Sequence, residues 1–204
     1  MMKRSLAGAI FVVAAAATAL GLSAGSAVAD ATVTVSYPVT GTTHINATDS
    51  DIALGPGTLT STVDLTTGAV TGSVTLPPAT STFTELGIIP VTVTTAFNQV
   101  GQTTGTINLQ TGAVTSSSQV NIQITDLKVA GIDIPVGGSC QTQTPVTEEL
   151  DSTAGFSVLA GGNVTGTYTI PDFAHCGLAT PLINLTIPGP GNTITLTLGS
   201  ATVG

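Results

Sequence analysis

The chain has 204 residues, of which 42% are hydrophobic and only 7% charged, with three basic residues against eleven acidic ones. Nucleic-acid affinity depends largely on Lys and Arg side chains that displace counterions, so this balance excludes a DNA- or RNA-binding protein. Disorder is excluded as well, because it requires low hydrophobicity together with high charge. The composition predicts a folded, acidic and threonine-rich protein.

Residues 1–29 have the pattern of a secretory signal peptide. Two basic residues near the start precede an apolar run rich in Ala, Val and Leu, and Ala27-Val28-Ala29 supplies the small residues that signal peptidase requires. We expect cleavage between Ala29 and Asp30, after which no transmembrane anchor is left. Residues 30–204 are expected to form a single domain.

After the cleavage site, almost every segment alternates apolar and polar residues with period two, which is typical of half-buried strands. In the segment 193–198, for example, Ile194, Leu196 and Leu198 alternate with three threonines. Short Gly- and Pro-containing turns separate these segments, and no helical period is sustained over three turns. The pattern predicts an all-β fold, an antiparallel β-sandwich that is immunoglobulin-like or jelly-roll-like.

Two stretches of the chain repeat the same local pattern. Residues 62–71 closely match residues 106–115, and each reads as a strand, a Thr-Gly turn and a returning strand. Gly68 and Gly112 are suited to the positive φ that a tight hairpin requires. We therefore predict two hairpins with turns at these glycines.

Acidic residues gather in two places, Asp49 with Asp51 and Glu148 with Glu149 and Asp151. Carboxylates can bind calcium, and paired carboxylates catalyse glycoside hydrolysis. The chain lacks both an EF-hand spacing and the tryptophans on which sugars stack. We interpret the clusters as solvated acidic loops, and whether either binds calcium stays open.

The only two cysteines, Cys140 and Cys176, are expected to form a disulfide in the oxidising compartment to which the signal peptide leads. A disulfide-bonded Cys176 cannot act as a nucleophile beside His175. His44 and His175 are the only histidines, and no serine lies in a Gly-x-Ser-x-Gly turn. The sequence thus predicts no catalytic residues, no metal site and no cofactor.

The C-terminal part resembles secreted, uncharacterised β-rich proteins of actinobacteria. The resemblance rests on residues 168–177, on residues 180–184 and on the block 187–198, which reads Ile-Pro-Gly-Pro-Gly-Asn-Thr-Ile-Thr-Leu-Thr-Leu. It implies a small exported β-protein of a Gram-positive cell envelope and brings no catalytic residues with it.

The sequence favours a non-enzymatic secreted or envelope-associated protein that acts as a structural, adhesive or binding module. Retention on the cell would be non-covalent, and exposed strand edges would allow self-association. The alternative is an oligomeric β-barrel pore of an outer envelope layer, against which the scarcity of aromatic residues counts. A secreted hydrolase is the third hypothesis, and it requires His44 or His175 to meet the Glu148–Asp151 cluster. The ligand, the oligomeric state and the strand order are not determined by the sequence.

Overall fold

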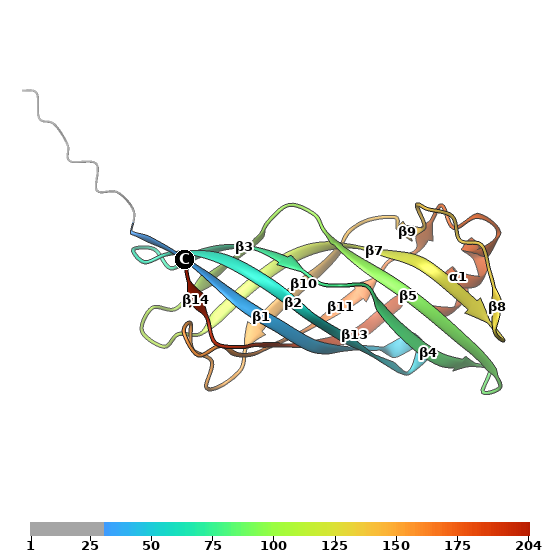
Figure 1. Ribbon diagram of the computed structural model, residues 1–204, viewed down its shortest axis with the longest axis horizontal. Helices are drawn as coiled ribbons and strands as arrows, with labels where there is room; N and C mark the ends of the chain where they lie inside the picture. Colours follow the sequence, from blue (N-terminus) through green and yellow to red (C-terminus); the bar gives the residue numbers. More distant parts are fainter. Residues whose placement is uncertain (1–30) are drawn as a thin grey trace, which may run out of the picture.

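A computed structural model describes residues 31–204 as an elongated, mostly β-stranded molecule (Figure 1). The predicted signal peptide and its cleavage between Ala29 and Asp30 lie outside the described residues. Strands from the whole described chain belong to one antiparallel sheet, in agreement with the predicted all-β class. Among these residues, none of the helices has the length and apolar character required to cross a bilayer.

Eight strands of this sheet form a closed ring. Each strand pairs with the next in antiparallel orientation, and pairing between β7 and β10 joins the two ends. In their order around the ring the strands are β10 (Val146–Ser152), β11 (Gly162–Ile170), β13 (Gly189–Leu198), β1 (Thr32–Ile45), β2 (Ser50–Asp64), β3 (Ala69–Thr75), β6 (Thr103–Ile107) and β7 (Val114–Val129).

The predicted β-sandwich, immunoglobulin-like or jelly-roll-like, therefore differs from the structure, which closes one sheet into a barrel. Period-two alternation places one apolar face inward in a sandwich and in a barrel alike, so it does not distinguish them. The pairing of Glu148 with Ser118 and of Leu150 with Ser116 closes the ring, and this contact joins strands that are distant in sequence.

The second half of β7 continues beyond the ring. There it pairs with β5 (Ile89–Gln99), which in turn pairs with β4 (Ala79–Glu85). This end of the molecule also carries α1 (Thr180–Thr186), β8 (Ile132–Asp133) and β9 (Gln141–Thr142), and the C-terminal β14 (Thr202–Val203) lies at the opposite end (Figure 1). The remaining elements are β12 (Phe173–Ala174) and the short 3-10 helices η1 (Asn46–Thr48) and η2 (Gly177–Ala179).

The two repeated stretches form the same hairpin turn. Gly68 joins β2 to β3 with a φ of 76°, and Gly112 joins β6 to β7 with a φ of 77°. In each turn the side chain four residues earlier accepts two backbone N–H bonds, from Thr66 and Thr67 to Asp64 Oδ1 and from Gln110 and Thr111 to Asn108 Oδ1. The similarity between residues 62–71 and 106–115 thus reflects a hairpin turn that occurs twice in one barrel.

Cys140 and Cys176 form the predicted disulfide, and both residues are fully buried. The bond lies beside the short pairing of β9 with β12. β9 begins directly after Cys140, and β12 ends two residues before Cys176. The disulfide fastens the segment before β9 to the turn that leads into α1.

Candidate functional site

The interior of the barrel is the candidate site, because it combines a cavity with an unpaired charged group. The cavity has a volume of about 100 Å³, and a second cavity of about 40 Å³ lies farther along the interior. Glu148, Val74 and Leu196 line both. The two volumes together approach the ~150 Å³ of an engineered apolar cavity that admits benzene.

One half of the wall around the larger cavity is apolar. Tyr37 and Val39 of β1, Val164 of β11, and Leu196 and Leu198 of β13 lie there with buried side chains. On β13 they alternate with exposed threonines, for example Thr195 and Thr197 beside Leu196. The alternation seen in the sequence is thus apolar inward and threonine outward.

Polar and small residues occupy one continuous row across the other half. Glu148 of β10 pairs with Ser118 of β7, whose hydroxyl accepts a hydrogen bond from Thr103 of β6 at 3.1 Å. Thr103 pairs with Gly72 of β3, and Gly72 pairs with Ser61 of β2. All five residues line the larger cavity. We call Glu148, Ser118, Thr103, Gly72 and Ser61 the interior polar row.

Glu148 carries the only formal charge on the walls of these two cavities within residues 31–204. It lies between the buried residues Val146 and Leu150 on the inner face of β10, and its own side chain is only partly exposed. Burial raises the pKa of Glu148 to about 7, with no hydrogen bond or positive charge from the described chain to oppose the rise. A carboxyl without a partner in apolar surroundings is costly to ionise.

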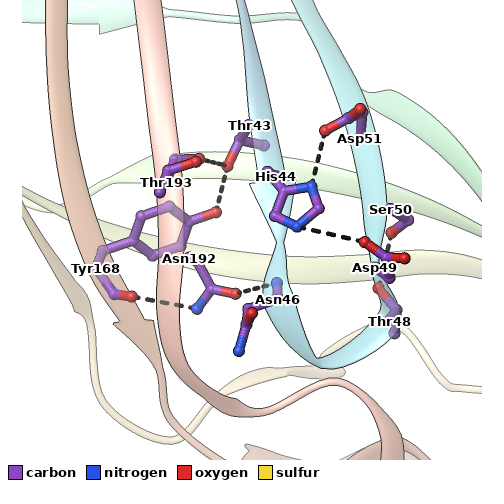
Figure 2. Close-up of polar contacts among 10 residues, drawn as sticks. All are labelled: Thr43, His44, Asn46, Thr48, Asp49, Ser50, Asp51, Tyr168, Asn192 and Thr193. Atoms are coloured by element: carbon purple, nitrogen blue, oxygen red, sulfur yellow. Dashed lines mark hydrogen bonds and ion pairs between the residues drawn. The ribbon is translucent and has the colours of Figure 1, made fainter.

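Tyr168 places a hydroxyl group at the smaller cavity. Thr43 Oγ1 donates to the backbone oxygen of Thr193 at 2.9 Å, so the Tyr168 hydroxyl is the donor in its 2.6 Å bond to Thr43 Oγ1 (Figure 2). The phenolic oxygen keeps its own acceptor capacity. Burial raises the pKa of Tyr168 to about 12, and the charge of Glu148 adds to this rise.

A loop between β10 and β11 covers one end of the larger cavity. Phe156 and Val158 of this loop line the cavity, and the hydroxyl of Tyr37 donates to the backbone oxygen of Val158 at 2.7 Å. The backbone N–H of Ala201 donates to the oxygen of Leu159 at 2.9 Å. Two hydrogen bonds thus hold the loop over the end of the barrel.

His44, considered above as a catalytic base, lies on the outer side of β1 and not in the barrel. Its Nδ1 is 2.9 Å from Asp51 Oδ1 and its Nε2 is 3.7 Å from Asp49 Oδ1, while the neighbouring Thr43 points inward (Figure 2). Ser50, between the two aspartates, is buried and bonds Thr48 at 2.7 Å. In the described chain His44 therefore contacts carboxylates and not a hydroxyl nucleophile.

The acidic residues on β10 do not form one cluster. Glu148 faces the interior, whereas Glu149 and Asp151 are exposed on the outer face of the strand. Adjacent residues on a strand point to opposite sides, which separates the carboxylates. Within residues 31–204, no three His, Cys, Asp or Glu side chains are grouped so that they could hold a metal ion. Neither His44 nor the exposed His175 lines the cavities of the barrel interior.

Of the interior polar row, only Glu148 is a candidate residue that the sequence indicates. The sequence does contain a sign of this row, namely polar residues at positions where the alternation expects apolar ones. Ser61 occupies such an inward position between Leu59 and Val63, and Glu148 occupies one between Val146 and Leu150. Polar or small residues at such positions mark places where the apolar face is interrupted. That the interruptions on five strands align is decided only by the register of the strands.

No family model matches the chain, and neither the curated proteins nor the solved structures contain a significant match.

Proposed function

We propose that this protein is a non-enzymatic, secreted or envelope-associated binding module that holds a small, largely apolar molecule inside its barrel. The observation that carries the proposal is the pair of adjoining cavities inside the barrel, which are lined mainly by apolar side chains and share the carboxyl of Glu148. Eight-stranded barrels are wide enough to be filled by side chains or to hold one small ligand. Small-molecule sites are typically concave and apolar, with a few polar groups.

Export from the cytoplasm is supported by the signal-peptide pattern of residues 1–29 and by the buried disulfide. The resemblance of the C-terminal part to exported actinobacterial proteins leads to the same proposal. Fractionation of producing cells tests it. We expect the protein in the medium or loosely bound to the envelope, starting at Asp30 and two hydrogens lighter than its reduced mass.

The oligomeric pore is less well supported by the side-chain orientations. Barrel strands that contact lipid carry apolar residues outward and polar residues inward. Here Ile194, Leu196 and Leu198 are buried inside, and the threonines between them are exposed. Extraction of the native protein only with detergent, as an oligomer, would favour the pore over the binding module.

A secreted hydrolase is supported less still. That hypothesis requires a histidine near the Glu148–Asp151 cluster, whereas His44 contacts Asp49 and Asp51 on the outer surface.

Binding of a neutral apolar probe tests the proposed function. Toluene is titrated into the purified 30–204 protein while amide shifts are followed by NMR, and we expect saturable changes at residues of β2, β6, β7 and β10. Ser61→Leu, which fills the cavity, should abolish them. Thr60→Leu is the matched control, since Thr60 is exposed on the outer face of the same strand. Absence of saturable binding to the native protein would overturn the proposal.

A further inference from the structure

We infer that the interior site selects a small apolar molecule that carries a protonated amine, and that Glu148 is the residue that binds this ammonium group. The inference rests on the proposed function and names the class of ligand. It is carried by the position of an unpaired carboxyl, at the junction of two apolar cavities, in a part of the molecule that contains no cation.

Positively charged side chains are scarce in this protein. Beyond the predicted cleavage site the only Lys or Arg is Lys128, which is on β7 outside the cavities and binds Asp133 Oδ1 at 2.6 Å. No side chain at the two cavities therefore supplies a positive charge that would compensate an ionised Glu148. A carboxylate deprived of water gains most from a charged donor in direct contact.

The rest of the interior polar row suits an amine head group. Gln99 Nε2 donates to Thr103 Oγ1 at 3.2 Å, and Thr103 in turn donates to Ser118 Oγ. Ser118 is directly across the strand pair from Glu148, and Ser61 is at the far end of the row. Hydroxyl oxygens accept hydrogen bonds, so an ammonium that contacts Glu148 has the Ser118 hydroxyl as a further acceptor on the neighbouring strand.

The apolar half of the wall and the sizes of the cavities limit the remainder of the ligand. Val164, Leu196 and Leu198 offer only hydrocarbon to a bound molecule. The volumes of about 100 and 40 Å³ allow a body of about six to eight non-hydrogen atoms, by comparison with a benzene-binding cavity. A short alkylamine or arylalkylamine meets both conditions.

Three six-carbon probes with different head groups test the inference. Hexylamine, hexan-1-ol and hexanoate are each titrated calorimetrically into the purified 30–204 protein at pH 8. We expect hexylamine to bind at least about tenfold more tightly than hexan-1-ol, because a charge-assisted hydrogen bond replaces a neutral one. Hexanoate should bind most weakly, since its charge repels that of Glu148.

Two variants separate the role of Glu148 from general charge effects. Glu148→Gln should remove the preference for hexylamine and leave the affinity for hexan-1-ol unchanged. Glu149→Gln removes the same charge from the exposed face of the same strand and should change neither affinity. Methylammonium alone should bind far more weakly than hexylamine, because it lacks the apolar tail. Equal binding of methylammonium and hexylamine would overturn the inference in favour of a simple cation site.

The pH dependence in the native protein is a test that needs no variant. Hexylamine affinity should rise from pH 5.5 to pH 8 as Glu148 ionises, while hexan-1-ol affinity stays level. The other titratable groups lining the two cavities are Tyr37 and Tyr168, and burial raises the pKa of both above 10, outside this range.

The outcomes distinguish the two proposals. If toluene and hexan-1-ol bind but hexylamine binds no more tightly, the ammonium inference is wrong and the binding module stands. A preference for hexylamine that survives Glu148→Gln also overturns the inference. If none of the probes binds, the proposed function fails, and the inference fails with it.

Discussion

At the scale of single residues, Glu148 is the position where the chain departs furthest from ordinary barrel packing. Val146 and Leu150 on either side of it are buried, and a leucine at position 148 would continue their pattern. Burial of an unpaired carboxyl opposes folding whenever the group is ionised. A residue that lowers the stability of the interior in this way suggests a role other than packing.

This cost predicts the pH dependence of stability. Folding raises the pKa of Glu148 from 4.5 to about 7, so the folded protein keeps a proton that the unfolded chain releases between these values. The free energy of unfolding should therefore fall as pH rises from 4.5 to 7, by about 3 kcal/mol, and the Glu148 contribution should be constant above this range. Urea denaturation at a series of pH values measures it.

The variants isolate the contribution of this one group. Glu148→Gln should remove the fall in unfolding free energy between pH 4.5 and 7, and the exposed Glu149→Gln should retain it. If the native protein has the same unfolding free energy at pH 5 and pH 7.5, the raised pKa of Glu148 is contradicted.

Asp64 has the opposite effect on the pH dependence of stability, and this effect lies at lower pH. Backbone N–H groups of Thr67 and Thr66 lower its pKa below 3.8, so its contribution is present at higher pH and is lost only as pH falls below about 4.

At the scale of elements, the barrel strands depend on glycines that lie against the backbone of the neighbouring strand. Gly105 of β6 pairs with Ser116 of β7, and a Cβ at position 105 would collide with the backbone oxygen of Thr115. A glycine inside a strand often marks such a close approach of another backbone. The same kind of collision would occur at Gly41, Gly57 and Gly166.

Replacement of one of these glycines should therefore destabilise the barrel. Gly105→Ala is expected to lower the free energy of unfolding by about 2 kcal/mol, because β6 and β7 must separate to admit the methyl group. Gly138→Ala is the control, since a Cβ at position 138 meets nothing within 4 Å. Chemical denaturation of both variants measures the difference. Equal stability of the two variants would show that the strands tolerate the added atom.

At the scale of the whole molecule, the two ends are stabilised in different ways. The barrel has continuous ladders between neighbouring strands, whereas β9, beside the cysteines, makes only two residue pairs with β12 and one with β7. The Cys140–Cys176 disulfide lies next to that short ladder. The bond closes a loop that contains β10 and β11, and it fastens the two ends of that loop beside the short β9–β12 ladder.

Removal of the disulfide should consequently affect one end first. The double variant Cys140→Ala, Cys176→Ala is expected to lose up to about 4 kcal/mol of unfolding free energy by the chain-entropy relation. Amide hydrogen exchange should become faster in β9, β12 and α1, with a smaller change in β1, β2 and β13. Equal acceleration across all strands would indicate that the bond stabilises the barrel as a unit.

The sequence by itself determined the properties that arise from local chemistry. Alternation with period two gave the strands and their inward faces, and the Thr-Gly pairs predicted turns that now have a positive φ at Gly68 and Gly112. The presence of only two cysteines predicted the pairing of Cys140 with Cys176. Each of these properties depends on neighbours along the chain or on the number of residues of one type.

Only the tertiary structure decided the closure of the sheet and the location of the site. Closure depends on the register of β10 against β7, and alternation is the same whether a sheet closes or packs on a second sheet. Glu148, Glu149 and Asp151 form one cluster along the chain, but the pleat and the closed ring place Glu148 alone inside. The interior polar row contains residues of five strands. Their alignment depends on contacts between distant segments, which no local sequence pattern predicts.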